Sequence, residues 1–512
     1  MSIARKFNIR LILSILPFLL ASPAITTEWK SDWEWMEGEK SGVNFGSYPL
    51  GRTYPLAQRF EVFRTGWESH RVSAELGKVW SELPPAIPLK FQHIFVPGID
   101  VQLNLGLRRE ISAWHKDPLG GNWPLSSKEV DLNQPTVGFF RAEKNWGGLT
   151  LGRFPLHWSP SDEYGLALSH SVPYHNGMTF FLRSNHIQYL FLVSSLNPWL
   201  EGSPQGDTSN TDYPFGSEAW RQRHYPDKWS ENAHLRVYAD PIKTLIAHRI
   251  EIAYGSWQAG ITELNVIGGK TPDGLDLNPF GVYHNDFKEG FASKAISLDT
   301  KIKLPLNFTL FGELFIDDLR YSATEGEGSP SIIGLLGGLE HVWTRNPQSQ
   351  LMQSFHVIQT DPLMYRYYQP YNTLSSRFIL TSNNQEEGAT PFVDKYVVDY
   401  PLGYTRGGDA LDFRYKARVQ FGPNRGVLRL EYLTHGGAVL NIPYEQLADG
   451  TANKNRYKRE EWIVRFIASR VLGHGATLIA GAEEQVLLWP SRIQRDLSNH
   501  YQLNLGVSWQ WP

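Results

Sequence analysis

The sequence lacks cysteine, and beyond its first residues it lacks any long hydrophobic run. With no cysteine among 512 residues, a fold of this size does without disulfides and depends on its own core or hydrogen-bond ladder. No stretch after the N-terminal region approaches the roughly 18 apolar residues that a membrane helix needs. These two absences exclude a domain stabilised by disulfide bonds and a membrane protein built of transmembrane helices.

An excess of positive charge is also missing. The chain has 49 Lys and Arg against 52 Asp and Glu. Residues 1–24 hold three of the basic and none of the acidic side chains, which leaves 46 basic against 52 acidic in the remainder. A protein that binds nucleic acid through its general charge is basic, so we expect no nucleic-acid partner.

The N-terminus has the three parts of a secretory signal. Three basic residues precede the apolar stretch 11–21, and the small residues Ser22 and Ala24 follow it. The apolar stretch is too short to cross a bilayer. We therefore expect a signal peptide over residues 1–24, cleaved after Ala24 or, alternatively, after Ala21, and an exported protein.

Aromatic residues are abundant in a chain that is otherwise polar. There are 18 Trp, 23 Tyr and 26 Phe, which is 13% of the residues, at a mean hydropathy of −0.35. A membrane β-barrel combines these properties, because it has a polar lumen, a thin apolar outer band and aromatic girdles at both interfaces. The composition favours a barrel in a bacterial outer membrane.

From about residue 87 the hydrophobic pattern has a period of two. Residues 101–107, 413–421 and 501–511 show it most clearly. Such runs approach about ten residues, the length of a membrane-crossing strand, whereas soluble strands average about five or six. We count 18 or 19 candidate strands, and single-chain barrels close with an even number. The sequence predicts an all-β, antiparallel transmembrane barrel of about 18 strands over residues 87–512.

One hairpin predicts a charged lumen. A turn at residues 422–425 places apolar side chains opposite one another: Val419 with Leu428, Ala417 with Leu430, and Tyr415 with Tyr432. The other face then matches charged side chains: Lys416 with Glu431, and Arg418 with Arg429. Facing charges fit a water-filled or plugged lumen better than a dry core. We expect lumen charges at Arg414, Lys416, Arg418, Arg429 and Glu431.

Loop lengths give the barrel an orientation. The turns at residues 422–425 and 473–475 are tight, whereas the connections 382–410 and 436–458 are long and polar. Outer-membrane barrels have short periplasmic turns and long outer loops. The alternation slips once between about residues 344 and 410, so one strand is misplaced in our count there.

Residues 25–86 have a helical pattern instead. A helix over residues 68–83 places five apolar side chains on one face: Val72, Leu76, Val79, Trp80 and Leu83. Pro84 and Pro85 end it. This region has no second layer of its own, and a barrel mouth is available to it. We predict an N-terminal α-helical plug region over residues 25–86.

The final strand resembles the C-terminal signature that the outer-membrane barrel assembly machinery recognises. It alternates up to Trp511, although Pro512 follows the usual terminal aromatic. The assembly machinery and outer-membrane lipid or lipopolysaccharide are therefore expected partners.

Four segments resemble the Wzi-type capsule-assembly family of outer-membrane barrels, in this order: 151–169, 248–280, 313–318 and 401–411. The first departs from the family's Trp-Gly-Pro-Gly turn, since Ser159 and Ser161 stand at the glycine positions. The resemblance implies an 18-stranded barrel with an N-terminal helical plug. It also implies a role in holding capsular or exopolysaccharide at the cell surface, without catalysis.

Residues 201–231 are the strongest candidate for polysaccharide binding, because aromatic faces stack on sugars and arginines pair with uronate carboxylates. The candidate side chains are Tyr213, Trp220, Arg221, Arg223, Tyr225 and Trp229. The alternative interpretations are a loop folded over the barrel mouth and an aromatic girdle.

Two other function classes stay open. A diffusion channel for small solutes would use the same barrel and the same charged lumen. A barrel enzyme would need a reactive cluster, for which the sequence offers only two weak candidates: Asp317 and Asp318 with His284 or His341, and the group His170, Ser171, His175 and Asn176. No HExxH pattern or tight ligand spacing is present, so we expect no catalytic residue, no metal and no cofactor.

Overall fold

The computed structural model describes fifteen parts of the chain: residues 43–52, 71–72, 78, 80–81, 85–116, 123–196, 242–283, 292–318, 331–346, 348–366, 372–381, 395–436, 459–473, 476–489 and 496–509. Every structural statement below refers to these residues. Among them, no helix has the length and apolarity needed to cross a bilayer.

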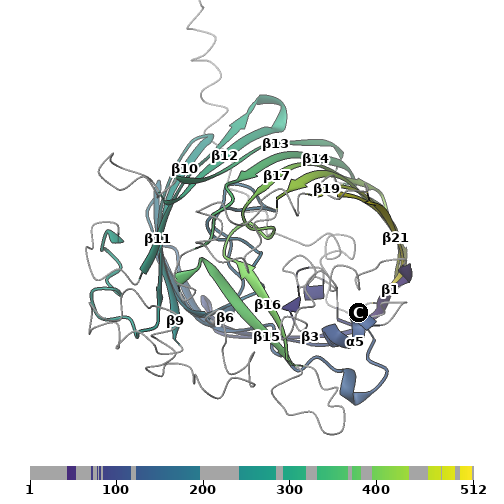
Figure 1. The fold of residues 1–512 in the computed structure, drawn as a ribbon, viewed down its shortest axis with the longest axis horizontal. Helices are drawn as coiled ribbons and strands as arrows, with labels where there is room; N and C mark the ends of the chain where they lie inside the picture. The colour runs from purple at the N-terminus through teal and green to yellow at the C-terminus, as the bar shows by residue number, and fades with distance from the viewer. Residues whose placement is uncertain are drawn as a thin grey trace, which may run out of the picture.

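Eighteen strands form one curved sheet, seen nearly end-on in Figure 1. In spatial order they are β3 (Ile87–Val96), β4 (Ile99–Leu107), β5 (Val137–Lys144), β6 (Gly147–Phe154), β7 (His175–Arg183), β8 (Ile187–Leu196), β9 (Lys243–Tyr254), β10 (Trp257–Gly268), β11 (Ala292–Leu304), β12 (Phe308–Asp318), β13 (Ile332–Asn346), β14 (Ser349–Thr360), β17 (Ala410–Phe421), β18 (Asn424–His435), β19 (Arg459–Gly473), β20 (Ala476–Trp489), β21 (Asp496–Trp509) and β1 (Val43–Arg52). All these neighbours are antiparallel, which confirms the predicted fold class.

The sheet curls until its two end strands meet. Cα atoms of β1 and β3 come within 8 Å of each other, although the described residues form no hydrogen-bonded ladder between these strands. The last strand, β21, pairs with both β20 and β1. The first and last strands of the chain are therefore neighbours in the ring, as barrel formation requires.

The N-terminal part differs from the helical region that we predicted over residues 25–86. Strand β1 belongs to the barrel sheet, and β2 (Arg71–Val72) is a second short strand. Of the predicted helix, Lys78, Trp80 and Ser81 are helical. The helical prediction is therefore wrong for residues 43–52 and 71–72. Pairing with β21 gives β1 a hydrogen-bond partner, a long-range gain that helical periodicity does not reveal.

The slip in alternation between residues 344 and 410 has a structural cause. Strand β14 pairs directly with β17, so residues 361–409 leave the wall. Within them, β15 (Ser375–Thr381) and β16 (Lys395–Pro401) form a separate sheet with β2. Figure 1 shows β15 and β16 inside the outline of the ring. A wall strand was thus not missed, because the chain folds inward there.

The β17–β18 hairpin has a tighter turn than predicted. Phe421 pairs with Asn424, so only Gly422 and Pro423 form the loop, and Gly422 has a φ of 57°. The observed pairs are Ala417 with Leu428, Lys416 with Arg429, and Arg414 with Glu431. The predicted register was therefore wrong by two positions. An even shift leaves each side chain on its predicted face.

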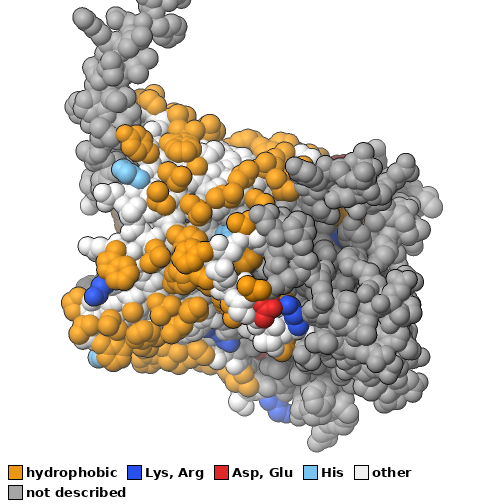
Figure 2. All heavy atoms as spheres, turned by 90° about the vertical axis from the view of Figure 1, so that its left-hand side faces the viewer, with side chains coloured by type: hydrophobic (Ala, Val, Ile, Leu, Met, Phe, Trp, Pro, Cys, Tyr) orange, Lys and Arg blue, Asp and Glu red, His pale blue; other side chains and the backbone are white. Residues whose placement is uncertain are grey.

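The outward face of the wall is apolar. Large exposed hydrophobic side chains alternate along its strands: Ile250, Ile261, Leu298, Leu310, Leu335, Phe355, Val419, Leu430, Val464 and Phe466. Figure 2 shows how densely hydrophobic side chains cover the described part of one side. The buried core lies on the opposite, inward face, where the wall meets the connections that follow β6 and β14. An apolar outward face is typical of a membrane barrel.

Candidate functional site

The predicted polysaccharide-binding residues lie outside the described residues. Strand β8 ends at Leu196 and β9 begins at Lys243. The connection between them contains Tyr213, Trp220, Arg221, Arg223, Tyr225 and Trp229. The description of the site therefore concerns the barrel interior.

A buried carboxylate on β12 is a central anchor of the β6–β7 connection (residues 155–174) inside the barrel. Glu313 is buried, and its two oxygens accept the backbone N–H groups of Leu166, at 3.1 Å, and Ala167, at 3.0 Å. The same carboxylate accepts the hydroxyls of Ser159, at 2.8 Å, and Ser297, at 2.9 Å. A buried carboxylate is energetically unfavourable without such donors. Glu313 and the β6–β7 connection therefore stabilise each other's position.

The β14–β17 connection packs against the β6–β7 connection. The hydroxyl of Tyr365 donates to the carbonyl of Leu166 at 2.7 Å and accepts the backbone N–H of Tyr404 at 2.7 Å. Asp317 on β12 accepts the backbone N–H of Tyr365 at 2.6 Å. Burial raises the pKa of both the Tyr365 and Tyr404 phenols, which stay neutral. The two connections and β12 thus form one packed unit.

The two connections approach too closely for any residue but glycine at one point. A Cβ atom on Gly403 would lie 1.9 Å from the carbonyl oxygen of Leu166. The backbone N–H of Ser169 donates to the carbonyl of Leu402 at 3.0 Å beside it. Three of the four segments that carry the family resemblance therefore meet here, namely 151–169, 313–318 and 401–411.

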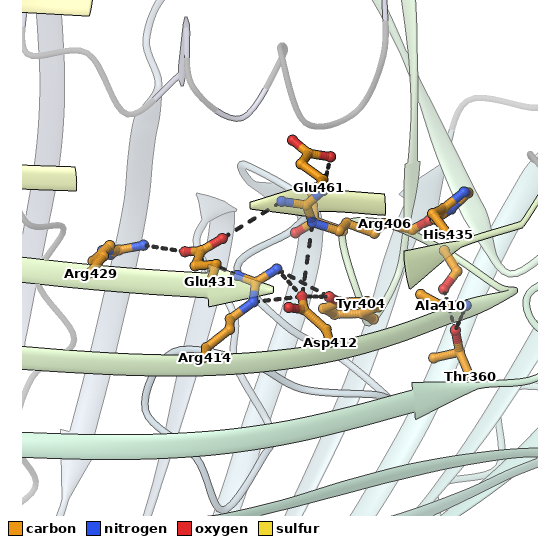
Figure 3. A network of polar contacts seen from close by, with 12 residues as sticks. Thr360, Tyr404, Arg406, Ala410, Asp412, Arg414, Arg429, Glu431, His435 and Glu461 are labelled. Atoms are coloured by element: carbon orange, nitrogen blue, oxygen red, sulfur yellow. Dashed lines mark hydrogen bonds and ion pairs between the residues drawn. The ribbon is translucent and has the colours of Figure 1, made fainter. Parts of the chain in front are cut away.

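A charged network joins the β14–β17 connection to the wall strands β17, β18 and β19 (Figure 3). Arg406, from the connection, lies 3.2 Å from Glu461 and 3.6 Å from Glu431. Arg414 donates through Nε to Asp412 at 2.6 Å, and Asp412 also accepts the hydroxyl of Tyr404. All of these side chains are largely buried. Their charges fix the connection by direct pairing rather than by facing open water.

The predicted lumen charges lie on the inward face and take part in this packing. Lys416 pairs with Glu163 of the β6–β7 connection, and Arg414 stacks on Tyr164 at 4.4 Å. Arg429 lies 3.8 Å from Glu431, and Arg418 occupies the next inward position on β17. Sequence analysis missed their partners Glu163, Arg406, Asp412 and Glu461. Of these residues, Asp412 could have been predicted to face inward, because it continues the alternation of β17.

Two histidines of the β6–β7 connection stack inside the barrel. The rings of His157 and His170 are 4.4 Å apart with an interplanar angle of 5°. Burial lowers the pKa of His157 from 6.5 to about 4 and that of His170 to about 2. Both rings are therefore neutral at pH 7, and the stack requires that they stay neutral.

The residues considered for catalysis have structural partners. The hydroxyl of Ser171 donates to the carbonyl of Gly403 and lies 2.7 Å from Thr405, and His175 lies 3.2 Å from Ser194. Asp317 holds Tyr365, as described above. His284 lies outside the described residues, and His341 stacks on Phe308 at 4.2 Å. Within the described parts of the chain, no group of three or more metal-ligating side chains is present.

No protein-family model and no curated protein matches the sequence. Solved structures match, among them Wzi, an outer-membrane protein involved in group 1 capsule assembly in Escherichia coli and a carbohydrate-binding β-barrel. That match has 14% identity over 84% of this chain and 79% of that chain, with a TM-score of 0.47. OprD from Pseudomonas aeruginosa matches with 9% identity over 92% and 95%, at a TM-score of 0.37. OccAB3 from Acinetobacter baumannii matches with 10% identity over 91% and 97%, at a TM-score of 0.38.

Proposed function

We propose that this chain is a non-catalytic outer-membrane barrel that holds capsular or exopolysaccharide at the cell surface. The observation that carries the proposal is the packed interior, where two connections are tied to the wall by buried hydrogen bonds and ion pairs. Leu166, Tyr365 and Leu402 have no exposed surface. A barrel for diffusion needs a continuous water-filled path, whereas packed side chains fill the described interior where these two connections meet the wall. This packing supports a function in the outward loops.

The apolar outer surface supports a membrane location. On β17 the exposed side chains run from Phe413 to Phe421, eight residues apart. At a rise of about 3.4 Å per residue and a tilt near 40°, this run covers roughly 20 Å of membrane thickness. The signal peptide predicted over residues 1–24 supports export. The C-terminal strand provides the segment that the barrel assembly machinery would bind.

The binding surface that we propose is the β8–β9 connection. The wall has tight turns at one end, such as Gly422-Pro423, and long connections at the other. Long connections face the cell exterior in outer-membrane barrels. A solvated sugar gains little from each contact, so retention needs several stacking and charge-assisted contacts along a repeating polymer. The aromatic and arginine side chains of residues 201–231 supply both kinds.

The test is a triple variant in which Trp220, Tyr225 and Trp229 become Ala. We expect polysaccharide to be released into the medium while its synthesis and export continue. A matched control replaces three aromatic residues at the tight-turn end, Trp146, Tyr254 and Trp257. The variant and control are compared for membrane insertion and for cell-bound polysaccharide. If the triple variant retains as much polymer as the parent, this loop is not the binding surface.

A diffusion channel is the second candidate, because the inward face of the wall carries charged side chains of both signs. Arg414, Lys416, Arg418 and Arg429 would line a path for anions if water reached them. Planar-bilayer conductance of the purified barrel separates the two functions. Open-channel conductance together with no polysaccharide binding would favour the channel.

A further inference from the structure

One connection of the barrel folds outward instead of inward. Residues 269–283 follow β10 and pack on the outer face of β8, β9 and β10; we name them the flap. Several of its contacts are to outward-facing side chains of the wall. The backbone N–H of Tyr283 donates to Glu263 at 3.1 Å, and the hydroxyl of Tyr189 donates to the carbonyl of Pro279. Figure 1 shows the region after β10 outside the ring, on the side of β9 and β11.

The flap covers polar groups at a place where a membrane barrel needs apolar ones. Glu263 and His248 face outward opposite each other at the middle of β10 and β9, and their side chains lie 2.8 Å apart. Asn265, the next outward residue on β10, is 3% exposed, and its side-chain oxygen has no hydrogen-bond partner among the described residues. Lys or Arg on the lipid face costs about 2–4 kcal/mol at the bilayer midplane, and Asp or Glu costs less but is still unfavourable there. The wall alone is therefore unsuited to lipid here.

The apolar band of the wall is correspondingly short beneath the flap. On β9 the exposed outward side chains are only Ile250, Ile252 and Tyr254, which span roughly 10 Å by the same geometry. Ile246, farther along the same face, has no exposed surface. On β17 the exposed band is about twice as tall. Something else must provide the apolar exterior above Ile250.

The flap provides that exterior. Leu275, Leu277, Phe280 and Val282 are 67%, 41%, 74% and 57% exposed, although each is a large hydrophobic residue. They continue the surface formed by Ile250, Ile261 and Leu298 on the neighbouring strands, and Figure 2 shows the hydrophobic cover on this side. A contiguous apolar patch of this kind marks an interaction site.

The backbone of the flap is also suited to lipid. Eight of the ten backbone N–H groups between Asp273 and Tyr283 donate to acceptors inside the flap or to Glu263. Irregular backbone at membrane depth is tolerated only where it is buried in protein or lines a water-filled cavity, so the flap backbone must be covered by the wall and by its own side chains. The one buried carboxylate of the flap, Asp276, lies 3.2 Å from the ammonium group of Lys270.

We propose that the flap is embedded in the outer leaflet of the membrane and that its exposed apolar side chains contact lipid acyl chains. The flap closes over the His248–Glu263 pair and restores the apolar band that β9 and β10 lack. This inference depends on the proposed membrane location.

The absence of cysteine makes the test direct, because single-cysteine variants can be labelled at one site. The test sites are Leu275→Cys and Phe280→Cys, each carrying a nitrobenzoxadiazole probe in phospholipid vesicles. Leu298→Cys, in the band of β11, is the lipid control. Leu125→Cys is the water control, since this 76% exposed leucine lies on the β4–β5 connection. Quenching is measured with doxyl-labelled acyl chains and with aqueous iodide.

We expect the flap probes to behave like Leu298, with strong quenching by doxyl lipid and protection from iodide. The proposal is overturned if they respond to iodide as Leu125 does while Leu298 reports lipid. It is also overturned if Phe280→Cys forms disulfide-linked dimers at high lipid dilution, which would assign the patch to a second copy of the chain. If Leu298 itself is open to iodide, the membrane location fails, and the inference fails with it.

Discussion

The β6–β7 connection folds into the barrel, whereas the flap (residues 269–283) packs on its outside. The difference follows the face on which the wall presents its polar anchor. Glu313 on β12 faces inward and accepts the N–H groups of Leu166 and Ala167. Glu263 on β10 faces outward and accepts the N–H of Tyr283. In each case a glutamate accepts backbone N–H groups of a connection. Whether that glutamate points into the barrel or out of it matches the side on which the connection packs.

The largest effect should come from removing the inward anchor. Glu313→Ala leaves two N–H groups and two hydroxyls buried without an acceptor. We expect a loss of about 3–5 kcal/mol in the stability of the packed interior. Limited proteolysis of residues 155–174 should accelerate while the wall stays intact. Glu143→Ala is the control, because that carboxylate is 42% exposed and 3.6 Å from its partner Arg183. Equal protease resistance in both variants would show that Glu313 does not hold the connection.

Acid should release the inward connection. Burial lowers the pKa of His157 from 6.5 to about 4 and that of His170 to about 2, so a released connection binds protons that the packed one does not. The packed β6–β7 connection keeps its full stability above pH 6.5. This stability falls as the pH drops toward 4, by about 3 kcal/mol for His157 alone. Proteolysis with an acid-tolerant protease should therefore rise over that range. The exposed His186→Gln variant should keep the same profile, and a flat profile in the parent would contradict the role of the stack.

Close packing between the two inward connections should tolerate no side chain at Gly403. In the Gly403→Ala variant the new methyl group meets the Leu166 carbonyl, and the backbone must move apart at a cost of about 1–3 kcal/mol. Hydrogen exchange of Tyr404 and Ser169 amides measures this. Gly274→Ala in the flap is the matched control, since nothing lies within 4 Å of its added Cβ. Unchanged exchange at both amides would disprove the contact.

The smallest effect should come from the outward anchor. Glu263→Gln keeps an acceptor for the N–H of Tyr283 but removes the charge that His248 meets, so we expect a loss of about 1 kcal/mol. Amides of residues 273–283 should exchange faster, while those of β6–β7 do not change. Faster exchange in both connections would mean that the two anchors are not independent.

Alternation in the sequence was sufficient for the wall strands from residue 87 onward, but not for β1 or for the interior. The period of two places Arg414, Lys416 and Glu431 on one face, and it is blind to an even shift, so the hairpin register was wrong by two while the face was right. Glu313 and Leu166 are 147 residues apart, and no local sequence pattern predicts their contact. Strand β1 was interpreted as part of a helical region for the same reason, because its partner is β21.

Conductance of the purified barrel in planar bilayers tests the central claim most directly, which is that anchored connections fill the interior. The parent should show no stable open-channel current, and Glu313→Ala should show current as the β6–β7 connection is released. A parent that conducts steadily, at a level that Glu313→Ala does not change, would contradict the account and favour a diffusion channel.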